Sequence, residues 1–306
     1  MSLLINIPDR PLDKLVAKLT EFIPVEEIKL LPDVKEPAEI DFALVWKHQH
    51  GSLMPFKNLK AISSFGAGVD SIIEDPLLPD VPIARIVDAD LAMNMGRFVL
   101  SQVLSHRLRA TQFQQQQERQ IWKPKSPRSG NKVGILGLGQ LGIATANTLS
   151  LNGFEVLGWS RTQKNIDGVT CLSGEDGFQA LLPQIDYLVC LLPLTEQTQG
   201  ILNKSMFEQL PSHCVVINVA RGLHLVEADL IWALDSGELD FAFLDVFQTE
   251  PLPEAHDFWT HPKIQITPHV SAVTNVDTAV KQVVENYQRC KEGLPLLNMI
   301  DSSKGY

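Results

Sequence analysis

The sequence has few cysteines, no long apolar run and no excess of positive charge, and each shortage excludes a class of protein. Its 306 residues include 4 cysteines with no Cys-x-x-Cys pair, which favours free thiols in a reducing compartment over a disulfide framework or a metal site. No stretch reaches the roughly 18 apolar residues of a membrane-spanning helix. The apolar start, Met1 to Pro8, is short and lacks the basic residues of a signal peptide. We therefore expect a cytoplasmic protein.

Basic residues are outnumbered by acidic ones, 26 to 36, so the formal net charge is −10. Such a chain does not attract nucleic acid or an anionic membrane as a whole. An anionic substrate would need locally placed arginines and backbone N–H groups. The length, with 44% hydrophobic residues, is sufficient for two domains with separate cores.

Short apolar runs alternate with helix-like stretches, a pattern typical of parallel sheets with helices on their faces. One long helix is expected at 95–118, followed by a Pro- and Lys-rich exposed loop at 122–131. The expected strands lie at residues 3–7, 42–46, 59–63, 133–136, 155–158, 187–192, 215–219, 241–245 and 264–267. Further helices are expected at residues 12–22, 142–150, 226–235 and 275–291.

A glycine-rich hexapeptide lies between the expected strand at 133–136 and the helix that follows it. Its first glycine permits a tight turn, its second lets the backbone approach a pyrophosphate, and its third lets the helix pack on the strand. A turn without a ligand is the alternative, but the strand-to-helix context favours a dinucleotide site. We expect the cofactor to contact the residues of this turn: Gly137, Gly139, Gln140, Leu141 and Gly142.

The chain also lacks the acidic residue that usually follows the glycines by about twenty positions and binds the ribose 2′-hydroxyl of NAD. Ser160, Arg161 and Thr162 stand there instead, with Lys164 close by. A carboxylate would repel a 2′-phosphate, whereas arginine and hydroxyl groups bind it. We predict a preference for NADP(H), with NAD(H) possible. The alternative is that Arg161 is a solvated surface charge.

The ends of three expected strands carry residues suited to the reduction of a 2-keto acid. Arg221 suits the carboxylate, because its planar guanidinium matches that group. His269 suits proton donation, because its charge changes near neutral pH, and a nearby Glu250 would stabilise the imidazolium. Asp245 is expected to accept a hydrogen bond from the nicotinamide carboxamide. Each residue alone has an ordinary structural alternative, but together behind a dinucleotide motif they favour catalysis.

These motifs resemble the D-isomer-specific 2-hydroxyacid dehydrogenases, and most closely the bacterial glyoxylate/hydroxypyruvate reductase A branch of that family. The resemblance covers nearly the whole chain, is densest from Val133 to Thr274, and extends to Gly305 and Tyr306. It is carried by the segments 43–46, 66–70, 137–142, 159–162, 191–193, 219–222, 244–247, 250–253 and 268–269.

The resemblance implies a role for each matching segment. Arg221, Glu250 and His269 would form the catalytic triad. The cofactor would also contact Leu192, Pro193 and Ala220, and the substrate would contact Trp46, Ala67, Gly68 and Arg221. For Trp46, a core tryptophan at the end of a buried strand is an equal alternative.

The resemblance further implies two Rossmann-like, doubly wound parallel-sheet domains. A dinucleotide domain, 97–270, would be inserted into a flavodoxin-like substrate domain made of 1–96 and 271–306. A homodimer formed through the dinucleotide domain is also implied. One departure is Arg97, near the hinge, where many relatives carry glutamate.

The expected function is NADPH-dependent reduction of a short 2-keto acid, such as glyoxylate or hydroxypyruvate, to the D-2-hydroxy acid, with no metal. Formate oxidation needs no carboxylate beside the histidine, so Glu250 argues against it. A cofactor-sensing protein on the same scaffold is a second alternative. The intact set of Arg221, Glu250 and His269, and the lack of a long disordered tail, argue for catalysis.

Overall fold

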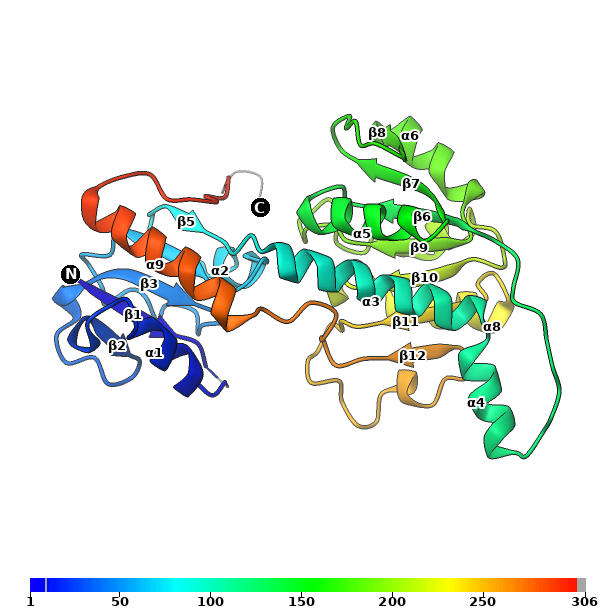
Figure 1. Ribbon diagram of the computed structural model, residues 1–306, viewed down its shortest axis with the longest axis horizontal. Coiled ribbons are helices and arrows are strands. Elements are labelled where there is room, and N and C mark those ends of the chain that lie inside the picture. Colours follow the sequence, from blue (N-terminus) through cyan, green and yellow to red (C-terminus); the bar gives the residue numbers. More distant parts are fainter. Residues whose placement is uncertain (9, 302–306) are drawn as a thin grey trace. The chain divides into compact units, whose positions relative to one another are not determined.

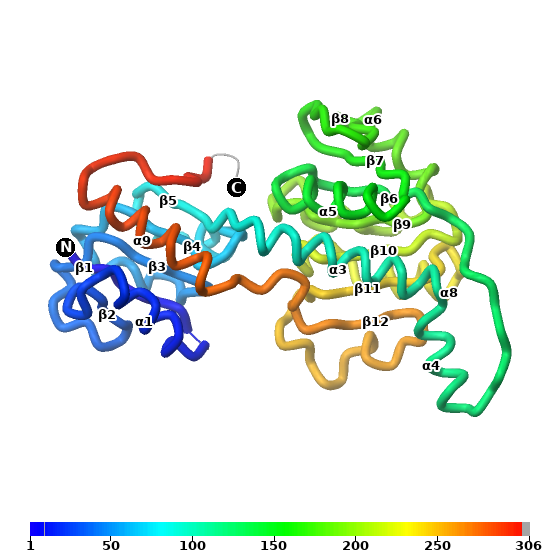
Figure 2. The backbone as a smooth tube through the Cα atoms, in the orientation of Figure 1, coloured from blue at the N-terminus to red at the C-terminus, as the bar shows by residue number. Residues whose placement is uncertain are grey.

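A computed structural model describes residues 1–8 and 10–301. The chain forms two compact units, one made of the residues up to 91 together with those from 274 onward, and one made of residues 92–273. Each unit is built on its own parallel sheet with helices packed against it (Figures 1 and 2), which confirms the predicted fold class. The resemblance at Gly305 and Tyr306 lies outside the described residues.

The first unit is built around a parallel sheet with the strand order β2-β1-β3-β4-β5. Its strands are β1 (Ser2–Asn6), β2 (Ile28–Leu30), β3 (Ile40–Val45), β4 (Ala61–Ser64) and β5 (Ile83–Ala84). Its helices are α1 (Asp13–Leu19), α2 (Asp70–Ile73) and α9 (Val276–Glu292). Successive side chains point to opposite faces of a strand, so Leu3 and Ile5 join the core that includes α1 and α9, while Leu4 joins the core on the other face.

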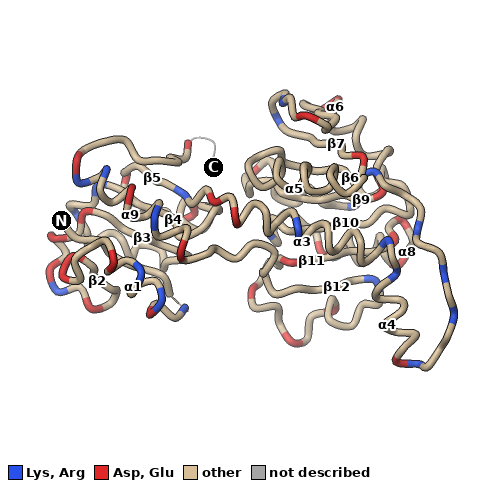
Figure 3. The backbone as a smooth tube through the Cα atoms, viewed as in Figure 1, with Lys and Arg blue, Asp and Glu red and all other residues tan. Residues whose placement is uncertain are grey.

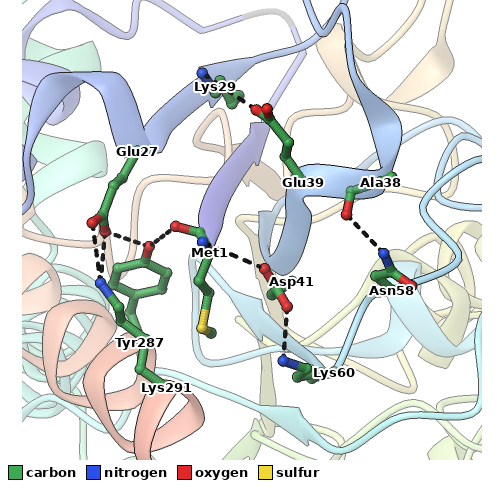
Figure 4. Close-up of polar contacts among 10 residues, drawn as sticks. All are labelled: Met1, Glu27, Lys29, Ala38, Glu39, Asp41, Asn58, Lys60, Tyr287 and Lys291. Carbon is green, nitrogen blue, oxygen red and sulfur yellow. Dashed lines mark hydrogen bonds and ion pairs between the residues drawn. The ribbon is translucent and has the colours of Figure 1, made fainter.

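Helix α9 belongs to the first unit because its apolar face and its polar side chains both contact N-terminal elements. Val280, Val283 and Tyr287 are buried against the sheet. The Tyr287 hydroxyl lies 2.7 Å from Glu27 Oε2 and 2.8 Å from the Met1 carbonyl oxygen, and Lys291 pairs with the same glutamate (Figure 4). Burial raises the pKa of Tyr287, with the hydrogen bond to Glu27 adding to it.

The second unit contains a parallel sheet with the strand order β12-β11-β10-β9-β6-β7-β8. Its strands are β6 (Lys132–Leu136), β7 (Glu155–Ser160), β8 (Val169–Ser173), β9 (Tyr187–Cys190), β10 (Val215–Asn218), β11 (Phe241–Leu244) and β12 (Ile264–Ile266). Its helices are α4 (Ala110–Glu118), α5 (Gln140–Leu151), α6 (Gly174–Leu181), α7 (Lys204–Phe207) and α8 (Glu227–Ser236), together with most of α3 (Ala89–Arg107).

Both faces of this sheet are covered, which explains why its central strands are apolar throughout. Helices α3 and α5 lie on one face, where Val99, Val103, Ala146 and Leu149 pack on the strands. The two helices approach closely at Gly96, where a Cβ atom would lie 2.5 Å from Thr148 Oγ1. Helices α6, α7 and α8 supply the core of the other face.

The predicted long helix at 95–118 is wrong in two respects. Helix α3 already begins at Ala89, and the following chain is broken between α3 and α4. The break occurs at Arg109, whose backbone has a φ of 61°; a non-glycine residue in this left-handed region ends the regular helix. The segment 119–131 is then mostly exposed and carries several basic residues (Figure 3).

The sequence patterns also missed three strands at or near sheet edges: β2, β5 and β8. They are short or only partly buried, so they lack the long apolar run of a central strand. All four cysteines are free, and burial raises the pKa of Cys190 to about 12. No helix in the described part of the chain is both long and apolar enough to cross a membrane.

Candidate active site

The glycine turn follows β6, at the position where the strand order of the second sheet reverses. Helix α5 begins within this turn, at Gln140. Gly137 has a φ of 101°, and a Cβ atom there would lie 2.7 Å from the Leu191 carbonyl oxygen. A Cβ atom on Gly142 would lie 1.9 Å from the Gly137 carbonyl oxygen. These two glycines are therefore required by the packing of the protein itself.

Gly139 is different, because a Cβ atom there would have no described atom within 4 Å. Its φ of −79° is open to any residue, so neither sterics nor backbone conformation inside the protein demands glycine. A bare backbone beside open space at the start of a helix fits the approach of a diphosphate. The turn therefore has the form that a dinucleotide cofactor requires.

The segment proposed for the 2′-phosphate lies directly beside this turn. The Gly137 amide donates to the Trp159 carbonyl, at 2.9 Å, which joins the turn to the end of β7. Ser160 ends that strand, and its hydroxyl donates to the Thr162 carbonyl at 2.8 Å. Arg161 and Thr162 are exposed. The predicted cluster and the glycine turn are thus neighbours at one edge of the sheet.

The other predicted cofactor segment follows β9, on the opposite side of the turn. The Leu191 amide donates to the Leu136 carbonyl, at 2.8 Å, so Leu192 and Pro193 continue along the end of β6. Ala220 follows β10, the next strand of the sheet, and its amide donates to Asn218 Oδ1 at 3.2 Å. These residues all lie at the carboxyl ends of β9 and β10.

Arg221 is held at the end of β10 by contacts of both its main chain and its side chain. Its carbonyl accepts a hydrogen bond from Asn218 Nδ2 at 2.9 Å, and its own Nη1 donates to the Ala220 carbonyl at 2.7 Å. The next residue, Gly222, has no room for a side chain, because a Cβ atom would lie 1.9 Å from the Phe247 carbonyl carbon. The Arg221 segment therefore packs directly against the chain that follows β11.

Glu250 and His269 form a hydrogen-bonded pair in the loops after β11 and β12. His269 Nδ1 lies 2.9 Å from Glu250 Oε2 and 3.1 Å from Oε1. The two side chains are 22% and 33% exposed, so solvent and substrates can reach the pair. With Nδ1 bonded to the carboxylate, Nε2 is the ring nitrogen that can exchange a proton with another molecule.

The backbone of His269 is in the left-handed region, with a φ of 53°. Asp245, which is 1% exposed, binds the chain on both sides of this histidine. Its Oδ1 accepts from Thr267 Oγ1 at 2.6 Å and from the Val270 amide at 2.9 Å, and its Oδ2 accepts from the Ser271 amide at 2.9 Å. Asp245 thus secures the loop that carries His269. Its predicted contact with a nicotinamide carboxamide stays a prediction.

Three predicted substrate residues, Trp46, Ala67 and Gly68, lie in the first unit. The carbonyl oxygens of Gly66, Ala67 and Gly68 accept hydrogen bonds from the Ile86 amide, Arg85 Nη1 and Ser64 Oγ, at 2.9, 3.5 and 2.8 Å. Within the described part of the chain, the amides of Ala67 and Gly68 have no intramolecular acceptor. Two N–H groups in one short loop suit a carboxylate.

Trp46 follows β3 and lies over this loop, since a Cβ atom on Gly66 would lie 2.1 Å from its ring. Its ring packs on the core of the first unit, as the structural alternative expects, and the Arg10 guanidinium lies 5.3 Å from its centroid. Its Nε1 is buried and has no hydrogen-bond partner among the described residues. Both predicted roles of Trp46 are therefore compatible with its position.

One cavity of the second unit lies away from the predicted catalytic residues. It has a volume of about 420 Å³ and is lined by His106, Arg128 and Asp240, among others. These side chains lie near the start of β11, whereas the predicted catalytic groups follow the strand ends. Among the described residues, no group of three or more His, Cys, Asp or Glu side chains could hold a metal ion.

The sequence patterns missed one residue beside this site, His224, which is fully buried. It lies in the short 3-10 helix η4 (Gly222–His224) directly after Arg221. Its signal in the sequence was a single polar residue within an apolar segment, Leu223 to Val226. Arg97, in contrast, is exposed on α3.

The match to a family model decides the classification of this chain. Residues 100–271 match the model of the D-isomer-specific 2-hydroxyacid dehydrogenase NAD-binding domain. The chain belongs to this family. Curated 2-hydroxyacid dehydrogenase relatives include glyoxylate/hydroxypyruvate reductase A of Serratia proteamaculans, 40% identical over 300 residues and 95% of each chain. The same reductase of Yersinia enterocolitica is 41% identical over 274 residues, 87% of this chain and 88% of the relative.

Solved structures of 2-hydroxyacid dehydrogenases have the same fold. One from Xanthobacter autotrophicus Py2, in complex with NADPH and MES, has a TM-score of 0.94, 38% identity and coverage of 100% of this chain and 99% of its own. An NADPH-dependent glyoxylate/hydroxypyruvate reductase from Sinorhizobium meliloti, in complex with NADP and sulfate, has a TM-score of 0.93, 36% identity and full coverage of both chains. This chain is therefore an oxidoreductase of the 2-hydroxyacid dehydrogenase type.

Proposed function

We propose that this dehydrogenase uses NADPH to reduce a small 2-keto acid, such as glyoxylate or hydroxypyruvate, to the D-2-hydroxy acid in the cytoplasm. The observation that carries the proposal is the His269–Glu250 pair at 2.9 Å, on the same sheet edge as Arg221 and the glycine turn. The relatives named glyoxylate/hydroxypyruvate reductase support the choice of substrate. The second unit would hold the cofactor, and the loop of Ala67 and Gly68 in the first unit would bind the substrate carboxylate.

The preference for NADPH over NADH rests on Ser160, Arg161 and Thr162 beside the glycine turn. This cluster lacks a carboxylate, and its arginine and hydroxyl groups suit a 2′-phosphate. The similar structures that contain NADPH or NADP support this choice. NADH would bind less tightly, because it would forgo the contacts to the 2′-phosphate.

The bound cofactor would supply hydride to C2 of the keto acid. His269 would donate the proton from Nε2 to the ketone oxygen, while Glu250 stabilises the positive charge on the ring through Nδ1. Arg221 would bind the substrate carboxylate and polarise the ketone, because its guanidinium presents several N–H groups in one plane. The amides of Ala67 and Gly68 are further donors of the kind that binds a carboxylate.

Initial rates with NADPH and NADH, each with glyoxylate and hydroxypyruvate, test this function. We expect fast NADPH oxidation and slow NADH oxidation, and we expect Arg161→Ala to raise the KM for NADPH about ten- to hundredfold with little change for NADH. Equal rates with both cofactors would refute the preference for NADPH but not the reductase activity. Tight NADPH binding without turnover of any 2-keto acid would refute catalysis and favour a sensor.

We propose that the enzyme is a homodimer formed through its second unit. Leu108, Phe113, Ile121 and Trp122 are exposed apolar residues in and beside α4, and Trp122 is 98% exposed. Exposed large apolar side chains are a feature of interaction sites. Sedimentation velocity should give a dimer for the wild type and a smaller species for Trp122→Glu. A wild-type monomer at micromolar concentration would refute the dimer.

A further inference from the structure

We propose that His224 is a positioning residue that fixes the distance between Arg221 and the cofactor segment at Pro193. This inference rests on the proposed function and adds a residue to it. The imidazole of His224 is fully buried. It lies between two loop segments that follow neighbouring strands. Arg221 follows β10, and Pro193 follows β9.

The hydrogen bonds of His224 assign a separate task to each ring nitrogen. The Arg221 amide donates to Nδ1 at 3.2 Å, so Nδ1 acts as an acceptor. The Arg221 carbonyl oxygen also lies 3.2 Å from Nδ1, but it already accepts from Asn218 Nδ2 at 2.9 Å. With Nδ1 accepting, a neutral ring carries its hydrogen on Nε2, which donates to the Pro193 carbonyl at 3.2 Å. One ring thus bridges two backbone segments.

The backbone around His224 strengthens this bridge. The Leu202 amide donates to the His224 carbonyl at 2.9 Å, and the Val226 amide donates to the Leu202 carbonyl at 3.0 Å. The Pro193 carbonyl also accepts from Thr198 Oγ1 at 2.7 Å. The chain after Pro193 and the chain after Arg221 are therefore joined at several points, and His224 provides a side-chain connection between them.

This arrangement has a chemical consequence. Arg221 would hold the keto acid, and the Pro193 segment borders the glycine turn, so the bridge controls the distance between substrate and cofactor. Hydride transfer depends steeply on this distance, and a displacement of about 1 Å can cost a hundredfold in rate. An apolar residue at 224 would also remove the acceptor of the partly buried Arg221 amide, which destabilises that conformation.

Two substitutions separate the two tasks, because each amide side chain replaces one ring nitrogen. In His224→Asn, Oδ1 takes the place of Nδ1 and keeps the hydrogen bond from the Arg221 amide. The shorter side chain loses the hydrogen bond to the Pro193 carbonyl. In His224→Gln, Nε2 takes the place of the ring Nε2 and keeps the bond to Pro193, while the acceptor for the Arg221 amide is lost.

The experiment measures kcat and both KM values of the full chain with NADPH and glyoxylate. We expect His224→Gln to lower kcat/KM for glyoxylate about ten- to hundredfold with the KM for NADPH within about twofold of the wild type. We expect His224→Asn to raise the KM for NADPH about three- to tenfold and to change kcat less. If one variant does not fold, the other still tests the proposal, because each variant is expected to change a different kinetic constant.

His261→Gln is the matched control. The Lys263 amide donates to His261 Nδ1 at 3.2 Å, as the Arg221 amide does to His224, while His261 Nε2 bonds the Asp235 carboxylate at 3.3 Å instead of a backbone carbonyl. His261 lies before β12, away from the carboxyl ends of the strands. Equal losses in the His224 variants and this control, parallel to a lower Tm, would overturn the positioning role. Wild-type turnover tests the proposed function separately, because it does not depend on His224 variants.

Discussion

His269 Nδ1 lies 2.9 Å from Oε2 of Glu250, a residue 19 positions earlier in the chain. This contact orients the imidazole and leaves Nε2 as the ring nitrogen that can exchange a proton with another molecule. The Phe247 amide, which donates to Glu250 Oε1 at 3.2 Å, holds the carboxylate in turn. A buried backbone donor thus fixes the carboxylate, and the carboxylate fixes the ring.

Replacing Glu250 tests the chemical part of this relationship. Glu250→Gln keeps the shape but removes the charge that stabilises the imidazolium. We expect kcat to fall about ten- to hundredfold and the alkaline limb of the pH–rate profile to move to lower pH. Steady-state rates from pH 5 to 9 measure both effects. Glu254→Gln, at an exposed position nearby, is the control, and an unmoved alkaline limb in Glu250→Gln would contradict the assignment.

Gly139→Ala tests the cofactor turn, because a methyl group there meets open space rather than protein. The variant should unfold at the wild-type Tm but bind NADPH about tenfold or more weakly, since the methyl group would stand between the backbone and the pyrophosphate. Gly142→Ala is the contrasting variant, because its methyl group would meet the Gly137 carbonyl and lower the Tm. Fluorescence titration with NADPH gives the affinities. Unchanged affinity in Gly139→Ala would remove the turn from the cofactor site.

Asp245→Asn tests how the His269 loop is held. The carboxylate accepts three hydrogen bonds from residues 267–271, and an amide group in either orientation would place an N–H against one of these donors. We expect kcat to fall about tenfold or more with the KM for NADPH little changed. A rise confined to the KM for NADPH would instead favour the predicted contact with the nicotinamide.

Asp240→Asn tests stability at the opposite end of the sheet. The hydrogen bond from His106 lowers the pKa of Asp240, and Arg128 adds to the effect against the opposing influence of burial. A carboxyl group with a lowered folded pKa stabilises the protein above its unfolded pKa, and this contribution is lost as the pH falls through the folded value. At pH 7 we expect a loss of about 1–2 kcal/mol.

Urea unfolding at several pH values checks this prediction. The difference between the wild type and Asp240→Asn should shrink below about pH 4, where carboxyl groups of ordinary pKa become protonated. Asp167→Asn, at an exposed position, is the control and should change stability little. A difference that grows at low pH would have the wrong sign for this mechanism.

The alternation of apolar runs and helix-like stretches was sufficient to predict the central strands of both sheets. These strands are buried on both faces, so the hydrophobic signal is continuous and strong. The same reasoning failed at Arg109, where the helix breaks without a proline or glycine. It also failed at β2 and β5, because strands of two or three residues carry too little pattern to be seen.

The candidate site was predicted unevenly for a similar reason. Residues in recognisable motifs, such as Arg221 and His269, carry a signal of residue type and spacing. His224 carries only the weak signal of a single polar residue in an apolar segment, because its partners lie on the main chain of Pro193 and Arg221. Likewise, nothing in the sequence showed that Asp245 binds the loop on both sides of His269.

The sequence by itself determined the fold class, the family, and the chemical types of the groups available for catalysis, because these follow from hydrophobic periodicity and from residue types at short spacings. Only the tertiary structure decided which of these groups meet. The Glu250–His269 contact, the hydrogen bonds of Asp245 and the bridge made by His224 all join segments that parallel strands bring together at one edge of a sheet. Such contacts depend on strand order and register, which are global properties of the packed chain.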